Sequence, residues 1–310
     1  NNMFDSDFWG EIWQTISRCK GRSIMTAFGV FWGIFMLVLL VGAGMGLNNG
    51  LIGNIKDLPT NSFLLVPGET SSASHGFSRG RIWQMDNNDT KAIEAKLANK
   101  TQSVASVKFA SSDKLLVTSN NSEGDFTVAG VTPSYYKAMP HKLIEGRYIN
   151  DIDIAEERKV CVIGVHVAEQ LFPSINSYVN QQIVIDKVPY TVVGVCKNPN
   201  RALDIGVDPG KSVLLPITTL QLAYNAVGKV DISVVILKDQ YPASEYCGQV
   251  ASLVKERHFI AEEDATALNV TDLSQHLNQY YNLFKGIEIL IWLVGLGTLL
   301  AGLIGISNIM

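Results

Sequence analysis

Residues 25–47 read MTAFGVFWGIFMLVLLVGAGMGL and contain no Asp, Glu, Lys or Arg. As an α-helix rising about 1.5 Å per residue, this stretch would be about 35 Å long, enough to cross the roughly 30 Å hydrocarbon core of a bilayer. A second uncharged stretch, ILIWLVGLGTLLAGLIGISNIM, occupies residues 289–310. We therefore predict two transmembrane helices, at residues 25–47 and 287–310. The alternative for the first is a cleaved signal peptide, whose apolar region of about 7–15 residues is shorter.

The composition of the 310-residue chain excludes several classes of protein. Charged residues make up 17% of the chain, against about 25% in a typical soluble protein. Hydrophobic residues make up 47%, and the formal net charge is -4. These values exclude a disordered chain, a nucleic-acid binder driven by bulk charge and a small disulfide scaffold.

Basic residues on the flanks predict the orientation in the membrane. Arg18, Lys20 and Arg22 precede the first predicted span, and only Lys56 follows it closely. The positive-inside rule then places the N-terminus in the cytoplasm and residues 48–286 outside. Residues 307–310 bring no basic flank after the second span, so we expect a fragment of a protein with further spans.

The first 24 residues predict a cytoplasmic amphipathic helix. Phe8, Ile12, Trp13 and Ile16 share one face at helical spacing, so the helix would lie along the inner membrane surface. An ordinary helix that packs on another protein is the alternative.

The external region predicts an α+β domain with two lobes. Strand–helix–strand patterns occur within residues 60–112 and again within 222–272, and together they predict a split α+β lobe. Residues 113–221 contain short strands punctuated by Gly and Pro, which indicates a β-rich insert. The residues Asn88, Asp89 and Thr90 are expected to cap the first helix. The Ser- and Gly-rich loop 69–81 is expected to be mobile, either idle or in contact with a substrate or an adaptor.

Apolar residues at heptad spacing predict that both spans extend outward as a helical stalk, over residues 47–58 and 273–288. The residues of this seam are Leu51, Ile55, Leu58, Leu273, Leu277, Tyr280, Phe284 and Ile287. Such a rigid connection could transmit movement between the membrane and the domain, and simple packing without transmission is the alternative.

Small residues at four-residue spacing within the spans predict close helix packing in lipid. They are Gly29, Gly33, Gly42, Gly46, Ala301 and Gly305.

Catalytic and metal-binding motifs are not found in the sequence. Five scattered histidines lack the spacing of metal ligands, and no phosphate-binding loop occurs. We therefore expect no enzyme activity, cofactor or metal in this chain. The external Cys161 and Cys196 lie in apolar, strand-like runs and are expected to be buried thiols.

Six segments together resemble the MacB-type permease family, which includes lipoprotein-releasing and FtsX-like permeases. Arg22-Ser23-Ile24-Met25-Thr26 resembles the family's start of the first span, and residues 130–149 resemble a segment that ends in Gly-Arg plus an aromatic residue. The segments VCVIGVHVAEQLF, YTVVGV, VLLPITTLQ and GLIGISNIM follow in the family order. Gln181 and Gln182 stand where the family often has Gly, so that turn is expected to differ.

The resemblance implies the permease subunit of an ABC transporter in a Gram-negative inner membrane. It implies four spans, a two-lobed periplasmic domain, and a second permease chain in a homo- or heterodimer. ATP and Mg would be bound by a separate ATP-binding subunit. In efflux members, movement of the stalks drives periplasmic substrate into an adaptor and an outer-membrane channel.

Three alternatives stay open at this point. A lipoprotein-releasing permease would extract lipid-anchored proteins, and an FtsX-like regulator would activate a periplasmic cell-wall enzyme. A sensor or adhesion domain on two membrane anchors is the third.

Overall fold

The computed structural model divides the chain into two compact units. The residues that it describes are 20–52, 59, 61–111, 113–119, 122–173, 175, 177–198 and 207–307. One unit is Asn54–Asn278, and the other combines Asn1–Gly53 with Gln279–Met310. Most of the amphipathic helix expected within residues 1–24 lies outside the described residues.

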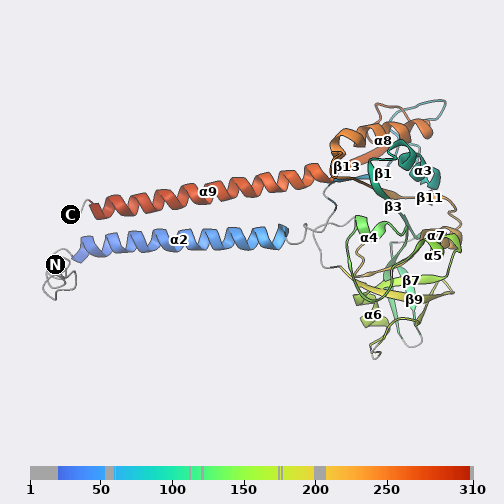
Figure 1. Ribbon diagram of the computed structural model, residues 1–310, viewed down its shortest axis with the longest axis horizontal. Coiled ribbons are helices and arrows are strands. Elements are labelled where there is room, and N and C mark those ends of the chain that lie inside the picture. Colours follow the sequence, from blue (N-terminus) through green and yellow to red (C-terminus); the bar gives the residue numbers. More distant parts are fainter. Residues whose placement is uncertain are drawn as a thin grey trace. The chain divides into compact units, whose positions relative to one another are not determined.

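Two long helices form the unit made by the chain ends, α2 (Lys20–Ile52) and α9 (Leu273–Ser307), and Figure 1 labels both. They contact each other at two glycines. A Cβ added to Gly44 would lie 2.9 Å from Ile291 Cδ1, and one added to Gly295 would lie 1.9 Å from Leu37 Cδ1. Within the described part of the chain, no helix reaches the length and apolarity needed to cross a membrane.

The first lobe of unit Asn54–Asn278 is a βαββαβ arrangement. In chain order its elements are β1 (Ser62–Pro67), α3 (Asn87–Lys96), β3 (Thr101–Phe109), β12 (Ile232–Leu237), α8 (Ala243–Arg257) and β13 (Leu268–Asp272). The strands follow the order β3-β12-β1-β13, and all neighbours are antiparallel. This is the order of ferredoxin-like folds.

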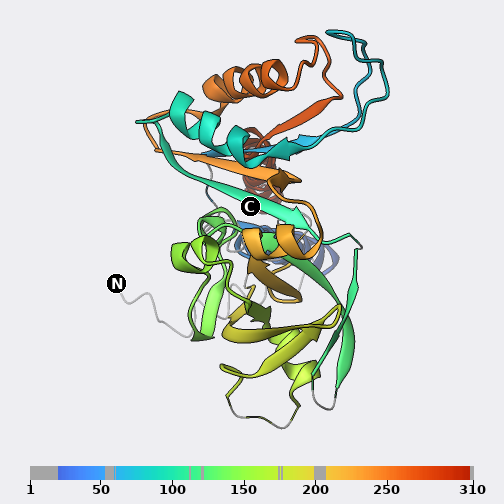
Figure 2. The same cartoon turned by 90° about the vertical axis from the view of Figure 1, so that its right-hand side faces the viewer.

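Both long helices of this lobe cover the same face of its sheet, as Figure 2 shows. Ile93 of α3 and Val250 of α8 are buried against Phe63 of β1 and Val235 of β12. These helices are held by the apolar stripe that each one presents to the sheet, because helix stability in proteins comes mainly from such packing. The small ribbon of β2 (Met85–Asp86) and β11 (Lys229–Val230) lies beside this core.

The second lobe, inserted between β3 and β12, is a closed β-barrel. Its ring consists of β4 (Leu115–Thr118), β5 (Glu123–Val131), β10 (Ser212–Pro216), β7 (Val160–Gly164), β9 (Val188–Lys197) and β8 (Gln182–Ile185). The parallel pairing of β10 with β5 closes the ring, which removes exposed strand edges. Strand β6 (Lys142–Gly146) pairs with β9 outside the ring, and β5 also pairs with β3.

Within the described residues, the barrel lobe also contains four short helices. They are α4 (Tyr135–Ala138), α5 (Asp151–Ala155), α6 (Val165–Leu171) and α7 (Ile217–Ala223). Cys161 and Cys196 are fully buried free thiols, which confirms their expected state, and Cys247 is free and half-buried. Burial raises the pKa of the Cys196 thiol to about 12, so this thiol stays protonated and inert.

The Gly-Arg pair at residues 146–147 fixes a turn after β6. Gly146 has φ +78°, and a Cβ there would lie 2.2 Å from the carbonyl oxygen of Val193. Arg147 then donates from both terminal nitrogens to the fully buried Asp153, at 2.6 and 3.0 Å. Glycine is required at residue 146 for two reasons. The backbone there is left-handed, which is unfavourable for a residue with a side chain, and a Cβ would overlap the Val193 carbonyl.

We expect Gly146→Ala to lower the free energy of unfolding by about 3 kcal/mol or more, since a left-handed residue costs about 1–3 kcal/mol before any clash. Gly228→Ala is the matched control, because Gly228 has φ +76° with nothing within 4 Å of an added Cβ. It should cost only about 1–2 kcal/mol. Urea unfolding of the purified chain measures both values, and equal losses would contradict the steric argument.

Candidate functional site

Residues 69–82, here called the arm, form a projecting hairpin between β1 and β2. The arm has two bridges, Glu69 with Ile82 and Ser74 with Phe77. At its tip His75 and Gly76 have φ +50° and +85°, the left-handed pair of a tight hairpin turn. The backbone N–H groups of Ser74 and Phe77 each donate to the other residue's carbonyl, at 3.1 and 2.9 Å.

A buried carboxylate, Asp264, anchors one side of the arm. It accepts hydrogen bonds from the backbone N–H groups of Ser71 and Ser72 at 2.7 and 3.0 Å, and from the Ser71 hydroxyl at 2.8 Å. It also accepts from Thr266 and Ala267 on its own loop. Burial alone raises the pKa of Asp264, but these donors outweigh burial and hold that pKa well below its usual range.

The other side of the arm is held through Arg81. The Arg81 backbone accepts from Thr70 N–H at 3.1 Å and donates to the Thr70 hydroxyl at 2.9 Å. Its guanidinium donates to the carbonyl of His258 at 2.6 Å and lies 4.3 Å from the centroid of the Phe77 ring. The structure therefore corrects the expectation of a mobile loop, because both sides of the arm are tied to the end of α8 and the loop that follows.

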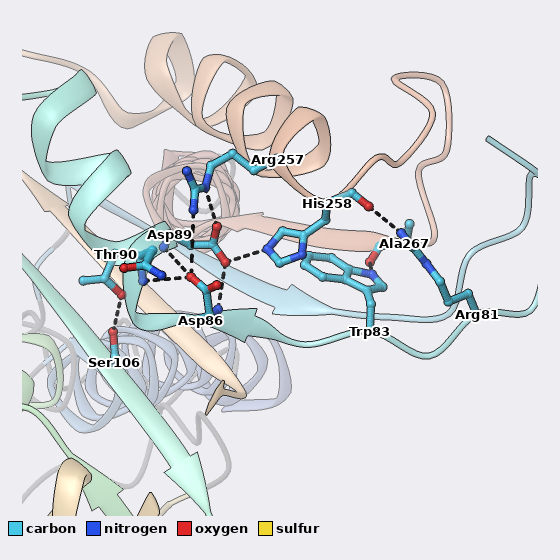
Figure 3. A network of polar contacts seen from close by, with 10 residues as sticks. Arg81, Trp83, Asp86, Asp89, Thr90, Ser106, Arg257, His258 and Ala267 are labelled. Atoms are coloured by element: carbon cyan, nitrogen blue, oxygen red, sulfur yellow. Dashed lines mark hydrogen bonds and ion pairs between the residues drawn. The ribbon is translucent and has the colours of Figure 1, made fainter. Parts of the chain in front are cut away.

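A charged network beneath the arm joins α3 to α8, as Figure 3 shows. Asp89 has no exposed surface and accepts from Arg257 Nε and His258 Nε2, both at 2.7 Å. It also accepts from the Asp86 backbone N–H at 2.7 Å. Burial raises the pKa of Asp89, but the hydrogen bonds from His258, Arg257 and Asp86 together lower it below its ordinary value.

The local sequence explains this geometry. Asp89 lies in the first turn of α3 and Arg257 in the last turn of α8, so each charge interacts favourably with the dipole of its own helix. Asp86 caps α3 by accepting from the Asn88 and Asp89 N–H groups. The helix α3 therefore begins at Asn87, with Asp86 as its cap. The cap expected at residues 88–90 was wrong, because the N–H groups of Asn88 and Asp89 already donate to the Asp86 side chain.

His258 and Trp83 link the network to the arm. Their ring centroids are 4.6 Å apart, and Trp83 Nε1 donates to the Ala267 carbonyl at 2.8 Å. The ring of His258 therefore contacts Asp89 and Trp83, while its backbone carbonyl accepts a hydrogen bond from the Arg81 guanidinium. Sequence reasoning missed this connection, although the Asp-Asn-Asn-Asp run at residues 86–89 gave a weak signal.

The outer surface of the arm is aromatic. Phe77 and Phe259 are 45% and 54% exposed and stack with ring centroids 6.3 Å apart, and the ring of His75 lies tilted beside Phe259 with centroids 5.8 Å apart. An open groove of about 410 Å³ adjoins them. Its lining residues are Ser74, His75, Ser252, Glu256, Ile260, Ala261, Glu262 and Glu263. In the described ranges no group of three or more His, Cys, Asp or Glu residues is placed to hold a metal ion.

The structure describes the surroundings of only some of the residues that were expected to form the stalk or to pack the spans. Leu273 is buried at the start of α9, and Ile287 is 36% exposed on the same helix. A Cβ on Gly42 or Gly46 would meet nothing within 4 Å, whereas Gly44 and Gly295 lie at the contact between α2 and α9. The packing role expected for Gly42 and Gly46 stays a prediction. Gly33 is buried within α2.

The remaining expected residues are placed only by their helix or not at all. Leu51 and Gly29 belong to α2. Leu277, Tyr280, Phe284, Ala301 and Gly305 belong to α9. Ile55 and Leu58 lie outside the described residues.

We expect acid to reduce the stability that the Asp264 carboxylate contributes by holding the arm. A carboxylate with a lowered folded-state pKa stabilises the fold above its unfolded pKa, and this contribution is lost as pH falls through the folded pKa. At pH 7 we expect Asp264→Asn to be less stable than wild type, and this gap should shrink below about pH 4, the unfolded pKa of Asp. Urea unfolding at a series of pH values measures the gap, and a gap that stays constant under acid would refute the assignment.

Sequence comparison places these features among known proteins. The family model of the MacB-like periplasmic core domain matches residues 23–244. The macrolide export ATP-binding/permease protein MacB of Neisseria gonorrhoeae is 28% identical over 302 residues, which are 96% of this chain and 44% of that protein. The protein of the same name from Bdellovibrio bacteriovorus is 26% identical over 304 residues, or 96% of this chain and 45% of that protein. The chain thus spans less than half the length of these curated relatives.

Solved structures share the fold. The periplasmic region of MacB from Actinobacillus actinomycetemcomitans matches with a TM-score of 0.58 and 17% identity, covering 74% of this chain and 96% of that one. The extracellular domain of the ABC-type transporter YknZ from Gram-positive bacteria matches with a TM-score of 0.54 and 15% identity, covering 68% and 100%. The mixed α/β architecture expected from the sequence is confirmed by these matches.

Proposed function

Because the chain belongs to the family of the MacB-like periplasmic core domain, we propose that it is a permease subunit of an ABC transporter. In this proposal a partner ATP-binding subunit hydrolyses ATP, and this chain converts the resulting movement into motion of its periplasmic domain. The motion drives efflux of periplasmic substrates, together with a second permease chain, an adaptor and an outer-membrane channel.

The proposal makes α2 and α9 the two membrane spans. Its support is the pair of uncharged stretches at residues 25–47 and 289–310. Large apolar side chains of both helices are also exposed: Phe31 and Val38 by 62% and 63%, and Trp292 and Leu293 by 64% and 70%. Water-soluble surfaces seldom expose such continuous apolar area, whereas lipid would cover it. Residues 48–286 are then periplasmic and the N-terminus cytoplasmic, in a Gram-negative inner membrane.

One observation supports transmission of movement above the others. Strand β13 ends at Asp272 and α9 begins at the next residue, with no linker. Asp272 accepts from the Ser274 N–H at 2.8 Å and from the Gln275 N–H at 3.4 Å, so it holds the first turn of α9. Leu273 is buried in the domain core, and β13 pairs with β1 along five residues. A displacement of this first turn would therefore be passed directly to the sheet.

Purification of the full-length permease from native membranes tests the proposal. We expect a stoichiometric ATP-binding subunit and a periplasmic adaptor to co-purify, with ATP hydrolysis in the complex. An ATPase accompanied by lipoproteins or by a cell-wall hydrolase, without an adaptor, would replace efflux by lipoprotein release or by enzyme regulation. The absence of any ATPase would refute the permease assignment.

A further inference from the structure

We propose that the groove beside the arm binds a basic amphipathic polypeptide segment of a partner protein. The proposal goes beyond the transport function, because it concerns recognition by the end of the βαββαβ lobe that carries the arm. The groove lies between the tip of the arm and the loop that follows α8, and Glu256, Glu262 and Glu263 line it as an acidic wall. The exposed rings of Phe77 and Phe259, here called the aromatic wall, border the groove beside its lining residue His75. The segment would place apolar side chains on the aromatic wall and Lys or Arg side chains on the acidic wall.

The aromatic wall borders the groove and consists of exposed side chains that are not used by the domain core. Phe77 and Phe259 stack on each other, and Ile82 at the base of the arm is 84% exposed. Phe259 has φ +56°, a left-handed conformation that is unfavourable for a bulky residue. Exposed aromatic residues that are rigidly held are typical of the centre of protein interfaces.

The acidic wall supplies the charge that selects the partner. Glu256, Glu262 and Glu263 line the groove, and none of them forms an ion pair within the described part of the chain. The Ser252 hydroxyl donates a hydrogen bond to the Glu262 carboxylate and brings no positive charge to it. The nearby Lys255 ammonium is buried and donates to the Glu262 carbonyl rather than to a carboxylate. Three carboxylates without a cation favour a basic ligand, which would relieve their mutual repulsion.

Anchoring of the arm makes the groove a preformed site. Asp264 fixes Ser71 and Ser72, and Arg81 holds the return side against His258 and Phe77. Because these bonds already order the arm, binding need not supply the conformational entropy of ordering it.

The shape of the groove favours a polypeptide over a small molecule. Small ligands are usually enclosed in pockets that bury about 70–90% of their surface. This groove is open, and the exposed rings of Phe77 and Phe259 lie beside it, outside its lining. A segment of several residues can contact both walls and the rim at once.

Fluorescence anisotropy with defined peptides tests this proposal. The probe is a labelled amphipathic peptide of alternating Leu and Lys faces, and its control has Glu in place of Lys. The protein is the full chain in nanodiscs of zwitterionic lipid, and empty nanodiscs give the background. We expect the Lys peptide to bind at least tenfold more tightly than the Glu peptide, and we expect its affinity to fall with added salt.

Variants of each wall locate the site. Phe77→Ala with Phe259→Ala should weaken binding of the Lys peptide at least tenfold, since buried aromatic anchors dominate such interfaces. Glu262→Gln with Glu263→Gln should weaken it at least threefold and flatten the salt dependence. Ile152→Ala is the matched control, because Ile152 is 52% exposed on the other lobe and should leave binding unchanged. Unchanged thermal unfolding midpoints verify that the variants fold.

Two outcomes would overturn the proposal. One is equal affinity of wild type and both double variants for the Lys peptide. The other is displacement of the peptide by tetraphenylphosphonium at the same concentration as by unlabelled peptide, which would make the groove a small-cation site. The assay needs no ATP-binding subunit, so failure of the permease assignment and failure of this proposal are distinguishable.

Discussion

Replacement of Asp89 by Asn is expected to lower the free energy of unfolding by about 3 kcal/mol, near the lower limit for breaking a buried ion pair. The carboxylate is fully buried and accepts from Arg257, His258 and the Asp86 backbone. Asn keeps the shape but loses the charge and one of the two acceptor oxygens, which leaves a donor unsatisfied. The lower limit applies because the side chain of Arg257 is 36% exposed.

Thermal unfolding and hydrogen exchange measure this effect. For a domain of this size, about 3 kcal/mol corresponds to a fall of about 6–12 °C in the unfolding midpoint. Because His258 also holds Arg81, amide exchange in the arm should accelerate in the variant. Asp86→Asn is the matched control, since Asn caps helices as well as Asp does. If Asp89→Asn were no more destabilising than Asp86→Asn, the network would not hold α3 to α8.

A flexible insertion in α9 is expected to abolish communication between the ATP-binding subunit and the domain. The insertion, seven Gly and Ser residues between Asn278 and Gln279, separates the capped first turn of α9 from the rest of the helix. A Gly/Ser linker behaves as a random coil and cannot transmit a displacement of its end. An inserted helical heptad of Ala, Glu and Lys is the length-matched control, because it keeps both the helix and the heptad register.

Hydrogen exchange in β13 provides a readout that needs no known substrate. In the complex with its ATPase, wild type and the heptad variant should show different exchange in β13 between the ATP-free and vanadate-trapped states. The flexible variant should lose at least four-fifths of that difference while ATP hydrolysis continues. If the flexible variant kept the difference, transmission through α9 would be refuted.

Local patterns in the sequence predict the elements of the βαββαβ lobe well. The strand–helix–strand pattern expected within residues 60–112 corresponds to β1, α3 and β3, and the one expected within 222–272 corresponds to β12, α8 and β13. Residues 63–66 of β1 form a continuous apolar run, and α8 carries apolar residues at helical spacing on the face that is buried in the same core.

Long-range pairings could not be predicted in the same way. The barrel closes through the parallel pairing of β10 with β5, whose paired residues are 85 apart in the sequence, and alternation identifies a strand but not its partner. Asp264 reaches Ser71 across 193 residues, so the acidic run at 262–264 gave no sign that it anchors the arm. The contact of His258 with Asp89 could not be predicted either, because these residues are also far apart in the sequence. The connection from α3 and α8 to the exposed aromatic residues depends on that contact.

The central claim is that ATP hydrolysis in a partner subunit moves this chain's periplasmic domain. Pulsed electron paramagnetic resonance on the reconstituted complex tests it most directly, with spin labels on Met45→Cys in α2 and Gln249→Cys in α8. Cys247→Ser removes the half-buried thiol beside the second label. The account predicts distinct distance distributions in the ATP-free and vanadate-trapped states. Identical distributions in a complex that hydrolyses ATP would contradict it.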